Sequence, residues 1–326
     1  MYIETVSVLQ GAKRTAWASL LAKCDLEQAQ TDQTVLVWEE DDLIASGSRD
    51  GNILKCIAVD DACQGQGLLA VVITHLRQSA FQAGHSHLFL YTKPQNEYLF
   101  TSLFFHTVAR TGTVVLMEDG SQGIRRFLAS LPVPAEGECG AIVMNADPFT
   151  MGHRYLVEEA ARKCSRLLVF VLSEDKGHFP AAVRLELVRR GTADLSNVTV
   201  LPTGPYLISS ATFPTYFLKD RDNADVVHCM LDVEIFTRHF APYFSITQRF
   251  VGTEPLSALT ARYNEVLKEQ LPRRGIPVEI IPRLEKNGIP VSASAVRAAL
   301  KNGDRELVRA LVPATTFHYL FKEETP

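Results

Sequence analysis

The chain of 326 residues has no long basic tract, no C-x-x-C pair among its six cysteines, and no apolar run near the roughly 20 residues that span a bilayer. Its net charge of −4 argues against nucleic acid as the main partner. The first residues, Met1-Tyr2-Ile3-Glu4, lack the basic region and apolar core of a signal peptide. Isolated cysteines in apolar contexts are typical of a reducing compartment. We therefore expect a cytoplasmic protein with no nucleic-acid partner, no membrane partner and no dedicated metal site.

The sequence does contain enough apolar material for two hydrophobic cores. Hydrophobic residues make up 46% of the chain and charged residues 21%, which is the balance of an ordinary soluble protein. The length suggests about two domains. Residues 130–138 are punctuated by proline, glycine and charge, as domain boundaries often are. We predict a first domain at residues 1–131 and a second at residues 138–326.

The second domain alternates between short apolar stretches and longer amphipathic ones. Strands are predicted at residues 141–145, 166–172, 197–201, 248–251 and 277–281, and helices at 153–164, 181–195, 256–271 and 294–302. Such alternation favours a parallel sheet with helices on both faces. Ligands of these sheets bind at the carboxyl ends of the strands. The predicted class is therefore α/β, with a Rossmann-like parallel sheet in this domain.

The most informative motif lies where the first of these strands gives way to a helix. The run Asn145-Ala146-Asp147-Pro148-Phe149-Thr150-Met151-Gly152-His153 ends in the T/H-x-G-H form of the nucleotidyltransferase superfamily. Gly152 would let the backbone approach a bound group, and the helix N-terminus offers free N–H groups and a positive dipole end. Thr150 and His153 would add a hydroxyl and an imidazole. The ordinary alternative is a helix cap followed by a histidine in the first turn.

A second motif near the C-terminus also predicts phosphate binding. The run Val291-Ser292-Ala293-Ser294-Ala295-Val296-Arg297 is similar to the I-S-x-S-x-x-R signature of the same superfamily, with valine in place of isoleucine. Ser294 is expected to cap a helix that starts at Ala295. Arg297, one turn further on, could bind phosphate oxygens with both of its terminal nitrogens. The alternative is a serine-capped helix with an exposed arginine.

The first domain has a different pattern, with strands predicted at residues 34–39, 52–59 and 88–92 and helices at 70–83 and 96–105. The segment Gln64-Gly65-Gln66-Gly67-Leu68-Leu69 resembles the pyrophosphate loop of GNAT-type acetyltransferases, with Gln64, Gly65 and Gly67 at the matching positions. Leu69 stands where that loop has glycine or alanine. The resemblance implies a GNAT-like α+β domain, which either binds acyl-CoA or pantetheine or is a scaffold that no longer catalyses.

Taken together, these residues resemble one family over nearly the whole chain, the citrate (pro-3S)-lyase ligases. The matching pieces are Asn145–Glu158, Phe179-Pro180 with Arg184, Tyr206–Pro214, Val251–Pro255 with Tyr263-Asn264, and Val291–Arg297. Asp147 departs from the family pattern, which has asparagine there. A carboxylate beside a phosphate site is unfavourable unless Mg²⁺ or an arginine offsets it.

The resemblance implies an ATP-dependent acetylation of the acyl carrier subunit of citrate lyase. Acetate and ATP, with the Mg²⁺ that accompanies ATP, would give acetyl-adenylate and diphosphate. The thiol of the carrier's phosphoribosyl-dephospho-CoA arm would then take the acetyl group and release AMP.

The resemblance also implies roles for individual residues. His153 would bind the α-phosphate, with Thr150 and Gly152 beside it, and Ser292, Ser294 and Arg297 would hold the β- and γ-phosphates. Lys176 would contact a phosphate or the acceptor, or else be a solvated loop lysine. Gly252 and Glu254 would touch ribose or adenine, or else form a tight turn. Asn145 and Phe149 complete the predicted ATP-binding set. Arg184 is as well explained by an ion pair with Glu186 or Glu158, and His178, His228 and His239 are expected to be structural.

Two other readings remain open. A plain nucleotidyltransferase of the pantetheine-phosphate or nicotinamide-mononucleotide type would share both ATP motifs and form a stable dinucleotide. The Tyr206–Pro214 segment and the first domain argue against it. The first domain could also be a binding module that recognises the carrier or its arm without chemistry.

Overall fold

The computed structural model describes residues 1–120, 122–132, 137–175, 177–207, 213, 215–218, 224–254, 257–286 and 288–322. The chain divides into two compact units, one of Met1–Gly123 with Pro214–Val227 and one of Ile124–Phe213 with His228–Pro326. The first unit therefore includes a segment from later in the sequence, Pro214–Val227. The prediction of a single boundary between residues 131 and 138 placed that segment in the second domain. No helix among the described residues is long and apolar enough to cross a membrane. All six cysteines are free thiols.

The first unit is built on a seven-stranded sheet in the order β1-β2-β3-β4-β5-β7-β6. The strands are β1 (Tyr2–Val6), β2 (Gln33–Glu39), β3 (Asp42–Asp50), β4 (Ile53–Val59), β5 (Phe89–Thr92), β6 (Phe105–Arg110) and β7 (Val115–Asp119). The helices are α1 (Gly11–Lys23), α2 (Leu68–Gln82) and α3 (Glu97–Thr101). The next helix, α4 (Gly123–Ala129), belongs to the second unit except for its first residue. All strand pairs are antiparallel except β4 with β5.

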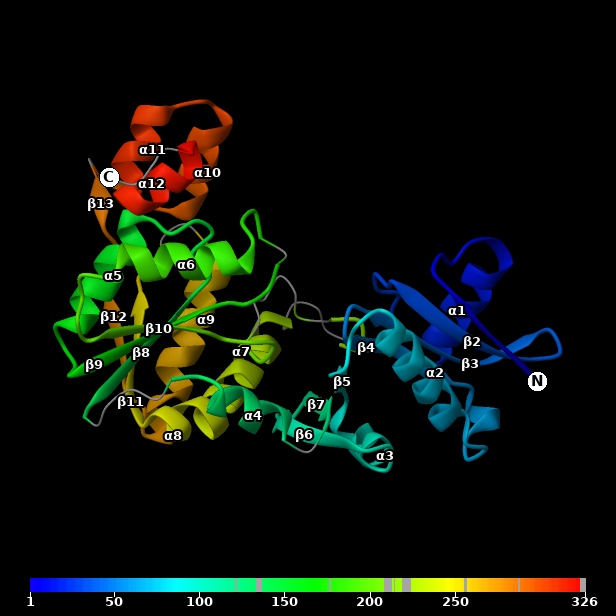
Figure 1. Cartoon of the computed structure of the whole chain (residues 1–326). Coiled ribbons are helices and arrows are strands. Elements are labelled where there is room, and N and C mark those ends of the chain that lie inside the picture. The colour runs from blue at the N-terminus through cyan, green and yellow to red at the C-terminus, as the bar shows by residue number, and fades with distance from the viewer. Residues whose placement is uncertain are drawn as a thin grey trace. The chain divides into compact units, whose positions relative to one another are not determined.

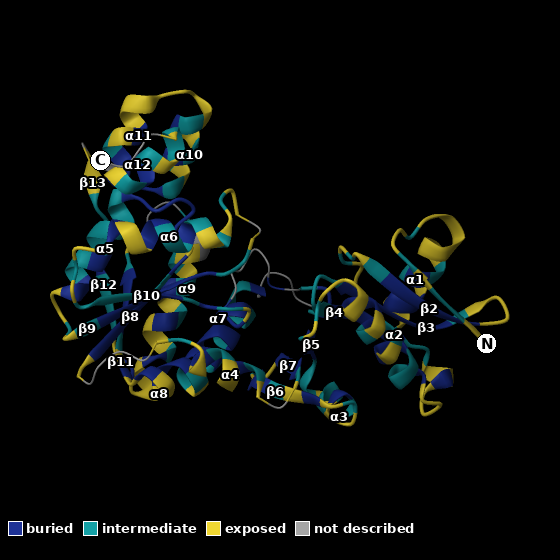
Figure 2. Cartoon of the chain, in the orientation of Figure 1, coloured by how far each residue is buried: buried dark blue, intermediate teal, exposed yellow. Residues whose placement is uncertain are grey.

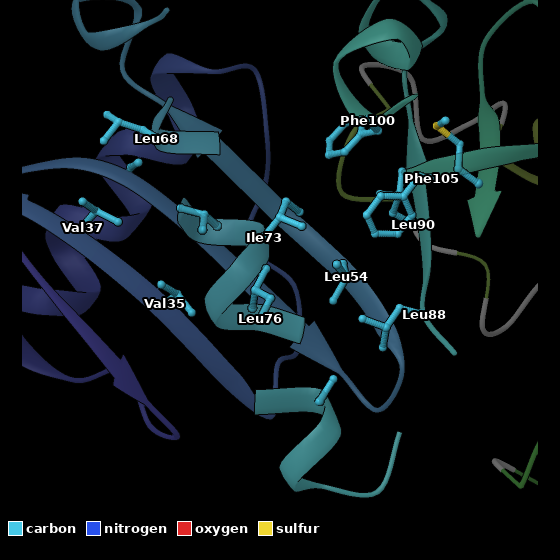
Figure 3. Packing of buried hydrophobic residues seen from close by; sticks show 14 of the residues in the cluster. Val35, Val37, Leu54, Leu68, Ile73, Leu76, Leu88, Leu90, Phe100 and Phe105 are labelled. Atoms are coloured by element: carbon cyan, nitrogen blue, oxygen red, sulfur yellow. The ribbon is translucent and has the colours of Figure 1, made fainter. Parts of the chain in front are cut away.

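The core of the first unit lies between α2 and the sheet. Leu68, Ile73 and Leu76 of α2 face Val35 and Leu54 of the strands, as Figure 3 shows. These side chains are at most 4% exposed, so each contributes about 1.5–3 kcal/mol to folding. The predicted strands 34–39, 52–59 and 88–92 and the helix 70–83 correspond to β2, β4, β5 and α2. The helix predicted at 96–105 ends at Thr101, and Phe105 instead begins β6.

The second unit is built on a five-stranded parallel sheet in the order β10-β9-β8-β11-β12. The strands are β8 (Cys139–Met144), β9 (Arg166–Val171), β10 (Val198–Pro202), β11 (Ile246–Gly252) and β12 (Val278–Ile281). The helices between the strands are α5 (Met151–Ala161), α6 (Ala181–Gly191), α7 (Ala224–Ile235), α8 (Ala241–Phe244) and α9 (Ala258–Gln270). The strand order reverses between β8 and β11, where such sheets bind ligands.

The predicted α/β class and the parallel sheet are confirmed. Figure 2 shows that the central strands β8 and β9 are buried, because helices cover them. A pair of two-residue strands, β13 (Glu285–Lys286) and β14 (Ile289–Pro290), leads into α10 (Ala293–Lys301), α11 (Arg305–Leu311) and α12 (Ala314–Phe321). These three helices form a group with a small core of its own around Val296, Val308 and Phe317 (Figure 1).

Candidate functional site

A cavity of about 190 Å³ opens at the carboxyl end of β11, beside the N-terminus of α5. Its lining includes Thr150, Gly152 and His153 from the first motif, Gly252 and Glu254 from the end of β11, and Val291 from the second motif. All of these residues belong to the second unit. The cavity therefore lies at the switch point of the parallel sheet, where both motifs were expected to meet.

Thr150 and His153 form a reciprocal cap at the start of α5. The Thr150 Oγ1 accepts a hydrogen bond from the backbone N–H of His153 at 3.3 Å, and the backbone N–H of Thr150 donates to His153 Nδ1 at 3.1 Å. Because Nδ1 accepts, it carries no proton in this arrangement, and the proton of the neutral ring is on Nε2. The histidine side chain thus both completes the cap and keeps an N–H donor on its other nitrogen. The two alternatives drawn from the sequence, a cap and a ligand-binding histidine, are compatible.

The surroundings of His153 keep its imidazole neutral. Burial and the nearby charge of Arg283 lower the pKa of His153 from 6.5 to about 4, and the Glu254 carboxylate opposes this only in part. A neutral ring whose Nδ1 is already an acceptor is a hydrogen-bond donor near neutral pH. It is poorly suited to act as a general base.

This pKa predicts how stability depends on pH. The unfolded chain binds a proton at His153 below about pH 6.5, whereas the folded protein does not bind it until about pH 4. The stability associated with the neutral ring is therefore complete above pH 6.5 and falls, by on the order of 3 kcal/mol, as the pH drops to about 4. Urea unfolding between pH 4 and 8 measures this. In His153→Asn this part of the pH dependence should disappear, and an unchanged profile would contradict the assignment.

Gly152 brings the two motifs into contact. A Cβ atom at Gly152 would lie 2.7 Å from the backbone oxygen of Val291. From the sequence we expected Gly152 to let the backbone come close to a bound group. In the structure the atom close to it is instead a backbone oxygen of the same chain. Glycine is needed there because the first turn of α5 packs directly on the segment that precedes α10.

The second motif forms a serine-capped helix, but with a different serine as the cap. Ser292 Oγ accepts a hydrogen bond from the backbone N–H of Ala295 at 3.1 Å, and α10 begins at Ala293. The prediction that Ser294 caps a helix starting at Ala295 is wrong by one half-turn. Ser292 is a better cap because its backbone is extended (φ −134°, ψ 155°), whereas Ser294 is already inside the helix. The two hydroxyls are 2.9 Å apart, so Ser294 still lies next to the cap.

Arg297 connects the second motif to the first. Its guanidinium donates to the backbone oxygen of Asp147 and lies 3.8 Å from the Asp147 carboxylate. It is not among the described residues that line the cavity. Phosphate binding by Arg297 stays a prediction, and the contact shown here is with the loop after β8.

Asp147 organises the loop between β9 and α6. Its carboxylate accepts hydrogen bonds from the backbone N–H of Phe179 at 2.9 Å and of His178 at 3.0 Å, and lies 3.1 Å from His178 Nδ1. Burial would raise the pKa of Asp147, but these donors and the charge of Arg297 outweigh burial and lower it. The carboxylate that looked unfavourable in the sequence is therefore neutralised by its own chain. His178, expected to be structural, contacts this carboxylate.

We expect Asp147→Asn to loosen this loop. An asparagine can accept through one oxygen only, so its NH₂ group would face one of the two backbone N–H groups. Leaving one buried donor without an acceptor costs about 1–3 kcal/mol, and the midpoint of urea unfolding should fall accordingly. His178→Ala is the matched control, because it removes only the contact of a ring that is 66% exposed and should cost less than about 1 kcal/mol. Equal effects of the two substitutions would contradict this role of the carboxylate.

Arg184 holds the same loop from the other side. Its guanidinium donates to the backbone oxygens of Asn145 at 2.8 Å and Phe179 at 3.1 Å, and to that of Glu174. Its side chain is fully buried, and burial lowers its pKa. The predicted ion pair with Glu186 or Glu158 is wrong, because Glu158 pairs with Arg154 and Glu186 with Arg190.

The remaining predicted residues of the first motif have mainly structural contacts. Asn145 Oδ1 accepts from Arg184 at 2.5 Å. The ring of Phe149 is fully buried and stacks on His153 at 5.9 Å, so it supports the imidazole rather than facing the cavity. Contacts of these two residues with ATP stay predictions. Lys176 lies outside the described residues.

Glu254 and Gly252 lie in the cavity wall, as the nucleotide prediction requires. Glu254 accepts from Arg283 Nη1 at 2.6 Å, and the Gly252 carbonyl accepts from Asn264 Nδ2 at 2.9 Å. Arg283 also donates through Nε to the Val291 oxygen at 3.3 Å. The sequence reasoning missed Arg283. Its position directly after β12, at the same edge as the other motifs, is the signal that could have found it.

The glycine loop of the first unit leads directly into α2, and binding of an acyl or pantetheine group there stays a prediction. Gly65 and Gly67 have φ of +79° and +78°, and Gly67 directly precedes α2. Gln64 is hydrogen-bonded to Asp61 at 2.7 Å. Leu69, the departure from the loop pattern, packs against the hydrophobic core of the first unit.

A parallel sheet with a capped histidine and a serine-capped helix around one cavity defines the second unit as a nucleotidyltransferase-type α/β domain. A phosphopantetheine adenylyltransferase from Clostridium botulinum is 26% identical over 152 residues, which cover 43% of this chain and 88% of that protein. Among solved structures, the chain is similar to Escherichia coli ElaA (12% identity, TM-score 0.31, 36% of this chain and 99% of that chain). It is also similar to an acyl-CoA N-acyltransferase from Pseudomonas aeruginosa (14% identity, TM-score 0.31, 36% of this chain and 96% of that chain).

More specific similarity covers almost the whole chain. The profile of the family described as "Citrate lyase ligase C-terminal domain" matches residues 139–320. The citrate (pro-3S)-lyase ligase of Klebsiella pneumoniae is 41% identical, covering 90% of this chain and 88% of that protein. The enzyme of the same name from Escherichia coli K12 is 39% identical, covering 95% and 91%. The chain belongs to the citrate lyase ligase family and is a ligase.

Proposed function

We propose that this chain uses ATP and acetate to acetylate the thiol of the citrate lyase acyl carrier protein, through an acetyl-adenylate. The observation that carries this is the neutral, capped His153, which keeps an Nε2–H donor at a cavity where both ATP motifs meet. The family relationship supplies the substrate class, and the cavity supplies a place for the adenylating step.

The first half-reaction is the attack of an acetate oxygen on the α-phosphorus of ATP. A P–O bond to acetate forms, and the bond to the β,γ-diphosphate breaks. Charge grows on the α-phosphate oxygens, and a fixed N–H donor stabilises it without reorganisation. His153 Nε2 is that donor in the proposal. The N-termini of α5 and α10 add backbone dipoles, and Ser292 and Ser294 add hydroxyl donors for the β- and γ-phosphates.

The second half-reaction transfers the acetyl group to sulfur. The thiolate of the carrier's phosphoribosyl-dephospho-CoA arm attacks the carbonyl carbon of acetyl-adenylate, the thioester forms and AMP leaves. The same donors at the α-phosphate would stabilise the departing AMP. Lys176, in the loop between β9 and α6, is proposed to contact a phosphate or the acceptor.

Mg²⁺ is proposed to arrive with ATP. The side chains in the described ranges include no group of three or more histidine, cysteine, aspartate or glutamate residues that could hold a metal ion. Asp147, the carboxylate within the first motif, already accepts hydrogen bonds from the backbone of His178 and Phe179. Mg²⁺ would be held by the phosphates and water, and its charge would offset theirs. A cytoplasmic location completes the proposal. Domain limits of 1–131 and 138–326 stay a prediction, from which the compact units differ in residues 124–131 and 214–227.

The test is diphosphate release from Mg-ATP and acetate, with and without the deacetylated carrier, while AMP and the acetyl thioester are followed. We expect diphosphate that depends on acetate, and AMP with acetyl-carrier only when the carrier is present. The similarity to phosphopantetheine adenylyltransferase makes a dinucleotide-forming transferase the second candidate. Diphosphate release with phosphopantetheine, and none with acetate, would establish that candidate instead.

A further inference from the structure

The sheet of the first unit has a gap between β4 and β5. These parallel strands pair only at Ile53 with Phe89 and at Leu54 with Leu90, although β4 continues to Val59 and β5 to Thr92. Leu54 and Leu90, at the last paired position, are labelled in Figure 3. Beyond them no further residues of β4 and β5 pair with each other, so the ladder between these two strands stops before their carboxyl ends. A gap of this kind presents backbone donors and acceptors to whatever fills it.

Tyr216 fills the first position of this gap. Its hydroxyl donates to the Tyr91 backbone oxygen at 3.2 Å, and a backbone hydrogen bond from Cys56 acts on the same hydroxyl. Tyr91 directly follows the last paired residue of β5, and Cys56 lies two residues beyond the last paired residue of β4. The phenol therefore bridges the two strands where the ladder between them stops.

The segment around Tyr216 is firmly held in the first unit. The backbone oxygen of Tyr216 accepts from the N–H of Glu27 at 2.8 Å. Tyr216 and Phe217 are 7% and 3% exposed, and their rings meet edge to face at 5.2 Å. Burial raises the pKa of the Tyr216 hydroxyl well above its usual value, so it stays a protonated donor. A buried phenol with both partners satisfied is a stable filling for a gap in a sheet.

The gap has the features of a slot for an extended arm that carries amides and ends in a phosphate. The glycine loop at Gly65 and Gly67 follows β4 and leads into the N-terminus of the 15-residue helix α2, with open space around both glycines. An arm lying between the two strands would take the place of the Tyr216 phenol, and its phosphate would reach the start of this helix. The two polar groups that Tyr216 occupies are ones that such an arm would use.

We propose that Tyr216 closes this slot, so that the first unit does not bind acyl-CoA or a pantetheine arm while Tyr216 is in place. The slot is latent, and vacating the Tyr216 position opens it. This explains how a glycine loop with the geometry of a phosphate site can be present in a unit that acts as a scaffold. The inference does not depend on the ligase reaction of the second unit.

The test is titration calorimetry of the full chain with acetyl-CoA, in saturating Mg-ATP so that the cavity of the second unit is occupied. Wild type and Tyr216→Phe, whose ring still fills the gap, should show no binding up to about 1 mM ligand. A dissociation constant of 1 mM corresponds to a binding free energy of about −4 kcal/mol. Tyr216→Ala should bind at least tenfold more tightly than that limit. Tyr216→Leu, which keeps apolar volume but not the reach of the phenol, is the second variant if the alanine protein does not fold.

Two outcomes would overturn the proposal. Binding of acetyl-CoA to wild type with the affinity of Tyr216→Ala would show that Tyr216 does not close the slot. Absence of binding in every folded variant would show that the gap is not a slot for such a ligand. Amide exchange gives an independent readout, because the Cys56 N–H should exchange faster in Tyr216→Ala and be protected again by acetyl-CoA.

Discussion

His153→Asn should lower kcat of acetyl-carrier formation by about 10²–10³-fold. This is the typical effect of removing one hydrogen-bond donor to a developing anion, and it corresponds to about 2.7–4 kcal/mol of lost transition-state stabilisation. Asparagine can still accept the Thr150 N–H through its Oδ1, so the cap of α5 is kept. It cannot place a donor where Nε2–H lies. Because this donor is used mainly in the transition state, KM for ATP should change little.

The measurement is steady-state kinetics with ATP, acetate and carrier varied in turn. His153→Ala removes both the donor and the acceptor of the Thr150 N–H, whereas Thr150 Oγ1 can still accept from the backbone N–H of residue 153. It should lose about 0.5–1.5 kcal/mol, the net contribution of one hydrogen bond, in unfolding free energy. His178→Ala, with its exposed ring, is the control and should be nearly fully active. A kcat for His153→Asn within threefold of wild type would mean that Nε2 does not stabilise the transition state.

The parallel sheet and the position of both motifs could be predicted from sequence because their signals are local. Apolar stretches alternate with amphipathic ones, and a strand followed by Thr150-Met151-Gly152-His153 has few conformations open to it. The capping serine was misassigned by sequence because Ser292 and Ser294 are both good caps by residue type. Only the extended backbone at Ser292 decides between them.

Features that depend on distant residues could not be predicted. The close neighbour of Gly152 is 139 residues away in the chain, the oxygen of Val291, and Arg184 bonds to three backbone carbonyls that carry no residue signature. Tyr216 is a similar case, because its partners Glu27 and Tyr91 lie far from it in the sequence, in the first segment of the first unit. Hydrophobic periodicity records which face of an element is buried, but not which distant segment covers it.

Gly152→Ala should destabilise the second unit and slow the reaction, although it adds only one methyl group. Elsewhere in a helix, alanine in place of glycine is stabilising by about 1 kcal/mol. Here the new Cβ would lie 2.7 Å from the Val291 backbone oxygen, a distance that real Cβ atoms do not tolerate. Because the neighbour is a backbone atom, the clash cannot be relieved by turning a side chain, and moving that oxygen would disturb its hydrogen bond from Arg283. We expect a net loss of about 1–3 kcal/mol in unfolding free energy, typical of an overpacked site.

The same clash should reduce activity, since it separates the two ATP motifs. Moving α5 away from the segment before α10 displaces His153 relative to Ser292, and a shift of about 1 Å in a positioned group can cost 10²-fold in rate. Gly112→Ala is the matched control, because nothing lies within 4 Å of its Cβ position and its φ is not in the left-handed region. That control should be as active as wild type and equally or slightly more stable. If Gly152→Ala matched the control in both urea unfolding and kcat, the direct packing of the first motif on the second would not be needed for the reaction.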